Sequence, residues 1–143
     1  MKLPAFLLFT LLIASCNSHK DNGDHTHDQA AGGNQALYDE VMDVHDEVMP
    51  KMNDIYSLTE KLKKEIADTP DMVEEKRKHI EAAIRQLDTA SEEMMVWMRN
   101  FNPLPDSLGE EKARRYLEVQ LEKVNKVKND MLQAIDEAEA LSQ

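Results

Sequence analysis

Three long stretches of the chain place an apolar residue at every third or fourth position, the spacing of one face of an α-helix. The first stretch contains Leu37, Val41, Val44, Val48, Met52, Ile55, Leu58, Leu62 and Ile66. Asn34 precedes it and has a side chain suited to cap a helix. The pattern therefore predicts a helix over about residues 35–67.

Pro50 falls inside this first pattern. Proline has no amide hydrogen, and its ring crowds the carbonyl four residues earlier, here that of Asp46. The sequence therefore predicts either one helix kinked near Pro50 or two abutting helices. The apolar spacing continues unchanged across residue 50, which favours the kink.

A second helix is predicted over about residues 70–101, with Thr69 as its cap and Pro70 in its first turn. Its apolar stripe consists of Val73, Ile80, Ile84, Leu87, Met94, Met98 and Phe101. Asn102 and Pro103 then end the pattern.

A third helix is predicted over about residues 107–141, because Ser107 to Glu110 has the form of a capping box. Its stripe includes Ala113, Leu117, Leu121, Val124, either Val127 or Lys128, Met131, Ile135, Ala138 and Leu141. Short connections between long amphipathic helices force antiparallel neighbours. We therefore expect an all-α fold, an antiparallel up-down-up three-helix bundle over residues 37–143.

The N-terminus carries an apolar run that is too short to cross a membrane. After Lys2 it covers about 11 residues, where a spanning helix needs roughly 20. It ends in Ile13-Ala14-Ser15-Cys16, which resembles the bacterial lipoprotein box, whose cysteine is lipidated. We expect residues 1–15 to be a lipoprotein signal peptide and Cys16 to anchor the protein in a membrane. The alternative is a cleaved secretory signal with an incidental cysteine.

Residues 16–36 join this cysteine to the helices and are small, polar and without periodicity. The composition predicts a flexible tether. His25 and His27 stand beside Asp24 and Asp28, so the tether offers imidazole and carboxylate groups to a divalent ion. The simpler interpretation is a solvated linker that happens to contain histidines.

Charge and motifs exclude several classes of function. The 28 acidic against 17 basic residues give a net charge of −11, which argues against nucleic acid as a partner. The chain has no Gly-rich phosphate loop, no His-Glu-x-x-His pair and no Cys-x-x-Cys-His haem attachment. We therefore expect no enzyme and no catalytic residue.

Methionines and one histidine form the remaining chemical signal. If the first two helices pair as an antiparallel hairpin, one end of the bundle collects Met42, His45, Met49, Met94, Met95, Met98 and Trp97. Thioether and imidazole are ligands that Cu(I) accepts, and His25 and His27 would act as capture groups. Methionine also fills irregular gaps in a core, so packing without metal is the alternative interpretation.

Three segments, residues 38–52, 94–98 and 116–132, resemble a group of small helical lipoproteins of Bacteroidota. Many members carry the label "viral A-type inclusion protein", which implies no viral role. The resemblance covers most of residues 37–135. It implies a helical fold and a place in the cell envelope, and it carries over no activity.

Two hypotheses of function follow. The first is a lipid-anchored protein of the cell envelope, on the periplasmic face or the cell surface, that acts as a non-catalytic helical binding or structural module. Its partner would be another helical protein or a second copy of the chain, and it would need no cofactor. The second is an envelope protein that binds Cu(I) or a divalent metal through the methionine and histidine cluster.

Overall fold

The computed structural model describes residues 26–103 and 109–142, with side chains from residue 33 onward. In these ranges the chain is all-helical and has no strand, which confirms the predicted fold class. The helices are α1 (Thr26–Val48), α2 (Lys51–Asp68), α3 (Glu74–Asn100) and α4 (Glu110–Leu141). Residues 1–15, Cys16 and His25 lie outside the described residues, and so does the side chain of His27.

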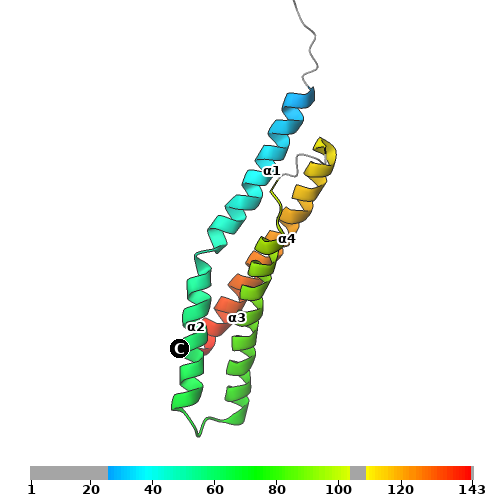
Figure 1. The fold of residues 1–143 in the computed structure, drawn as a ribbon. Helices are drawn as coiled ribbons and strands as arrows, with labels where there is room; N and C mark the ends of the chain where they lie inside the picture. Colours follow the sequence, from blue (N-terminus) through cyan, green and yellow to red (C-terminus); the bar gives the residue numbers. More distant parts are fainter. Residues whose placement is uncertain (1–25, 104–108, 143) are drawn as a thin grey trace, which may run out of the picture.

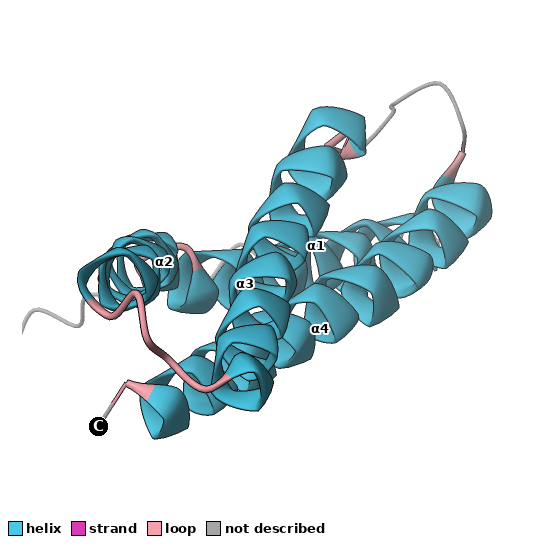
Figure 2. Ribbon diagram, turned by 90° about the horizontal axis from the view of Figure 1, so that it is seen from below, coloured by secondary structure: helices cyan, strands magenta, loops and turns pink. Residues whose placement is uncertain are grey.

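Figure 1 shows the path of the chain through these helices. The chain runs along α1 and α2, turns after α2 and returns through α3, and α4 then begins beside α1 and ends beside α2. α4 contacts α1, α2 and α3, and α2 also contacts α3. Figure 2 views the helices from below, with the turn between α2 and α3 in the foreground.

The most buried side chains recur seven residues apart in every helix. The series are Asn34, Val41, Val48, Ile55 and Leu62 along α1 and α2, then Ile80, Leu87 and Met94 on α3, then Leu117, Val124, Met131 and Ala138 on α4. A repeat of seven is the period of a coiled-coil seam, in which one narrow stripe faces the neighbouring helices. The core is therefore a thin column of side chains that runs lengthwise between the helices.

The structure divides the predicted first helix at Pro50. α1 ends at Val48 and α2 begins at Lys51. The amides of Met52 and Asn53 donate to carbonyls only three residues earlier, at 3.1 and 3.3 Å, and Pro50 has no amide hydrogen to continue the α-helical ladder. The structure thus shows two abutting helices, whereas the apolar spacing of the sequence favours one kinked helix.

α1 begins earlier than the sequence predicts. Its first residue is Thr26, so the second half of the predicted tether, residues 26–36, is helical. The alanines at 30, 31 and 36 are strong helix formers, and the following amphipathic turns supply the nucleus that they extend.

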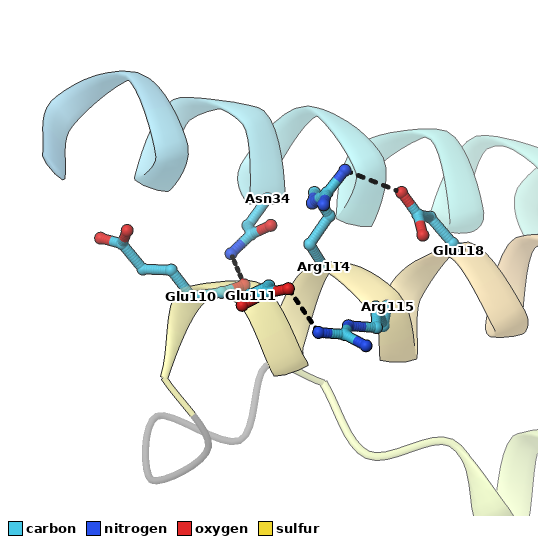
Figure 3. A network of polar contacts seen from close by, with 6 residues as sticks. All are labelled: Asn34, Glu110, Glu111, Arg114, Arg115 and Glu118. Atoms are coloured by element: carbon cyan, nitrogen blue, oxygen red, sulfur yellow. Dashed lines mark hydrogen bonds and ion pairs between the residues drawn. The ribbon is translucent and has the colours of Figure 1, made fainter. Parts of the chain in front are cut away.

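Asn34 is therefore an interior residue of α1, and the prediction that it caps the helix is wrong. Its side chain is 7% exposed, and Nδ2 donates to the backbone carbonyl of Glu110 at 3.0 Å. Figure 3 shows Asn34 pointing from α1 to the first turn of α4. Along the following turns of α4, Arg115 pairs with Glu111 and Arg114 with Glu118.

α3 begins later than predicted. Thr69 is the C-cap of α2 instead of the N-cap of α3, and the Met72 amide donates to the Thr69 carbonyl at 3.1 Å. Residues 69–73 reverse the chain, so α3 begins at Glu74, and Val73 is exposed instead of lying on the buried stripe.

α4 begins at Glu110, three residues after the predicted start. Ser107 lies outside the described residues, and Gly109 occupies the N-cap position without a side-chain cap. The φ of Gly109 is +74°, a conformation that residues with a side chain rarely adopt.

Candidate functional site

His45 and Met98 lie against each other where α1 passes α3. His45 Nε2 is 3.1 Å from Met98 Sδ, although the residues are 53 positions apart in the chain. The His45 side chain is 18% exposed, so one edge of this pair reaches solvent. The hairpin register expected from the sequence places these two residues at one end of the bundle, and the structure shows them in contact.

Asp46 determines which nitrogen of the His45 ring carries the hydrogen. Its carboxylate Oδ1 lies 2.8 Å from His45 Nδ1. An ionised carboxylate only accepts hydrogen bonds, so Nδ1 carries the hydrogen and donates it. In neutral imidazole the lone pair is then on Nε2, the atom that faces the Met98 sulfur.

Aromatic rings cover one side of this pair. The ring centroids of His45 and Trp97 are 5.8 Å apart, and Trp97 stacks on Phe101 at 4.9 Å. Trp97 Nε1 donates to Oε1 of the buried Gln120 at 3.1 Å, which ties α3 to α4 at this level. Phe101 also stacks on Tyr38 and Tyr116, so the aromatic cluster joins α1, the end of α3 and α4.

The other predicted methionines occupy different layers. Met94 is fully buried in the core, and Met49 packs against the core from the end of α1. Met42 and Met95 are half-buried, three residues before His45 and Met98 respectively, which is about one helical turn away.

The acidic side chains that the structure describes do not assemble a site for a hard metal ion. Among the described residues no three His, Cys, Asp or Glu side chains come together in a way that could hold an ion. Acidic side chains instead form ion pairs with basic ones on the helix surfaces. Glu47 pairs with Lys128 at 2.5 Å and Glu65 with Lys76 at 2.7 Å. His25 and His27 lie outside these observations.

A second feature is an open groove between α3 and α4, which the sequence analysis missed. It has a volume of about 700 Å³ near its Trp97 end and continues into a second hollow of about 530 Å³. Val96, Trp97 and Val127 line the first part, and Ala90 and Ala134 line the second. Val96 is 41% exposed, an aliphatic side chain open to solvent among the charged and polar side chains on the outer face of α3.

The two rims of this groove carry opposite charges near Trp97. Asp88, Glu92 and Glu93 stand on α3, and Lys123 and Lys126 stand on α4. A hydrogen bond to Asp130, the negative charge of Asp130 and that of Glu93 raise the pKa of Lys126 above its ordinary value, and Lys126 forms ion pairs with both acids, at 2.5 and 3.9 Å. Asp88 and Lys123 form no ion pair with any other residue that the structure describes.

The described helices were also compared with membrane spans and with known proteins. None of them has the length and apolar character needed to cross a bilayer. The chain matches no protein-family model, no curated protein and no solved structure.

Proposed function

We propose that this protein is a lipid-anchored module of the bacterial cell envelope that binds a helix of another protein and catalyses no reaction. The single observation that carries the proposal is the groove between α3 and α4, with its apolar floor and oppositely charged rims. The anchor is the lipid that the lipoprotein box predicts on Cys16, and it is tested separately from the groove.

The shape of the groove suits an α-helix. Its lining residues extend along α3 from Ala82 to Asn100, which corresponds to about 27 Å at 1.5 Å per residue. A partner helix of about five turns would fill this length and present an apolar stripe to Val96 and Trp97. Antiparallel packing of three rods, with α1 and α2 acting as one bent rod, leaves this outer groove open for a fourth helix.

The charges specify the partner further. Bases on the flank above α3 would meet Asp88, and acids on the flank above α4 would meet Lys123, because Glu92 already pairs with Arg99 and Lys126 with Asp130. Charges on a rim choose between partners and orientations more than they add affinity. We therefore expect an amphipathic helix with a basic flank and an acidic flank on either side of its apolar stripe.

Photo-crosslinking in the native envelope tests this proposal. A photoreactive amino acid replaces Val96 in the groove, and a matched variant carries it at Tyr56, which is 69% exposed on α2 outside the groove. We expect the Val96 position, but not the Tyr56 position, to capture one protein. Mass spectrometry should map the crosslink to a helix with the two charged flanks.

Controls separate this result from nonspecific capture. Lys123→Glu combined with Lys126→Glu reverses the α4 rim and should reduce the product several-fold. Equal products from both positions would contradict the proposal. So would a crosslinked species containing two copies of this chain, because it would identify self-association instead of a separate partner.

A further inference from the structure

We infer that His45 and Met98 bind one soft monovalent metal ion, Cu(I), between Nε2 and Sδ. The inference rests on the contact between these atoms and on the hydrogen bond from His45 to Asp46. It is independent of the groove, because neither His45 nor Met98 lines it.

The hydrogen bonding of His45 leaves a contact between two lone pairs. Nδ1 uses its hydrogen toward Asp46, so Nε2 of the neutral ring has no hydrogen to offer. The thioether sulfur has none either. Two electron donors 3.1 Å apart repel unless an electrophile lies between them or beside them, and that electrophile is either a proton or a metal ion.

The ligand types favour Cu(I) among the metal ions. Thioether and neutral imidazole suit Cu(I), whereas Mg²⁺ and Ca²⁺ need oxygen ligands. The described residues hold no cluster of three His, Cys, Asp or Glu side chains, so a site for Zn²⁺ has no support there. A carboxylate that accepts a hydrogen bond from a histidine ligand fixes the orientation and tautomer of the ring, and Asp46 lies in this position at 2.8 Å from Nδ1.

The surroundings of the pair suit a cation. The Trp97 ring lies beside His45 at 5.8 Å between centroids, and an aromatic face attracts a cation. The unbranched Met98 side chain can change its rotamer to widen the angle at the ion. Met42 and Met95, one turn away on each helix, are the thioethers available as a third ligand.

A competition titration tests the site on the full chain purified in detergent. Cu(I) is supplied anaerobically as the complex of a colorimetric chelator, and the fluorescence of Trp97, the only tryptophan, is recorded together with the chelator absorbance. We expect one Cu(I) per chain to be bound more tightly than micromolar, with a change in Trp97 emission. In NMR spectra of the wild type, the Met98 methyl and His45 ring signals should shift on addition of Cu(I).

Matched variants assign the ligands. Met98→Leu keeps the volume and removes the sulfur, and it should weaken binding by at least about tenfold, as removal of a metal ligand or its orienting partner does. Met131→Leu is the control, because Met131 is fully buried on α4 and is not part of the pair. Asp46→Asn should weaken Cu(I) binding by about tenfold and leave the helix content unchanged.

Three results would overturn the inference. They are binding no tighter than micromolar, equal affinity in Met98→Leu and wild type, and Cu(I)-induced NMR shifts that leave Met98 and His45 unmoved. The NMR measurement uses the wild type, so it decides the question even if Met98→Leu fails to fold.

Discussion

Among the residues whose side chains the structure describes, three polar side chains are buried between the aliphatic ones, and two of these three have hydrogen-bond partners. Asn34 donates to the Glu110 carbonyl, and Gln120 accepts from Trp97. The Thr59 hydroxyl on α2 is buried and has no hydrogen-bond partner. Asn34 and Gln120 connect helices by hydrogen bonds. The Thr59 hydroxyl loses its hydrogen bonds to water on folding, and no bond within the described structure replaces them.

Thr59→Val should therefore stabilise the protein. Valine keeps the branched shape and removes the unsatisfied hydroxyl, so we expect the free energy of unfolding to rise by about 1 kcal/mol. Chemical denaturation of both proteins measures the difference. Thr89→Val, at an exposed position of α3, is the matched control and should change little. A lower stability of Thr59→Val would contradict this account of the core.

The sequence is sufficient to predict which residues surround His45. It is not sufficient to predict the hydrogen-bond partner of the buried Asn34. A short connection fixes the register of an antiparallel pair, so spacing alone places His45 near Trp97 and Met98, as the structure has it. Asn34 belongs to the seven-residue series of buried positions, but its polar side chain resembles a cap when only the local sequence is considered. Its true partner, the Glu110 carbonyl, is 76 residues away.

At the scale of the elements, the break between α1 and α2 changes the hydrogen bonding without changing the register. Val48 and Ile55 lie on either side of it and keep the seven-residue spacing. Pro50 itself has φ −58° and ψ −25°, values that any residue in a helix adopts. The break therefore follows from the missing amide and not from a bend that the core requires.

Pro50→Ala should join α1 and α2 into one helix. The new amide can donate within the helix, and alanine fits the present backbone angles. We expect the amides of Met52 and Asn53 to exchange with solvent several-fold more slowly, with no loss of global stability. Hydrogen exchange measured by NMR reports both values. Unchanged exchange at these two amides would mean that packing, and not proline, sets the break.

Helix ends were the least predictable part of the elements. Thr69 and Pro70 have the local chemistry of a helix start, yet the chain needs residues 69–73 to reverse direction between α2 and α3. The start of α1 was missed for the opposite reason, because residues 26–36 lack an apolar stripe but continue a helix that is nucleated further along the chain.

For the whole molecule, composition and periodicity were sufficient to predict the all-α class, because no strand pattern competes with them. They did not predict the groove. That surface depends on which side of α3 remains outside once α1, α2 and α4 have packed. Among its described lining residues, Val96 is the large aliphatic side chain that is exposed. An exposed valine among charged residues is too common to identify a surface by itself.

The arrangement in Figure 1 is compatible with a membrane anchor at the N-terminal side. The beginning of α1 lies at one end of the molecule, and the groove runs along the side between α3 and α4. A lipid on Cys16 would therefore hold the protein at the membrane by one end and leave the groove accessible to a partner in the envelope. We propose that the molecule is oriented in this way at the membrane, with its N-terminal end toward the lipid.

The central claim, that this helical module is held at a membrane by lipid on Cys16, is tested most directly by metabolic labelling with a fatty-acid probe. The full chain and its Cys16→Ala variant are expressed in a bacterial host and separated into membrane and soluble fractions. We predict that the wild type is labelled and stays with the membranes, and that Cys16→Ala is unlabelled and leaves them. An unlabelled wild-type protein, or equal labelling of both, would contradict the claim.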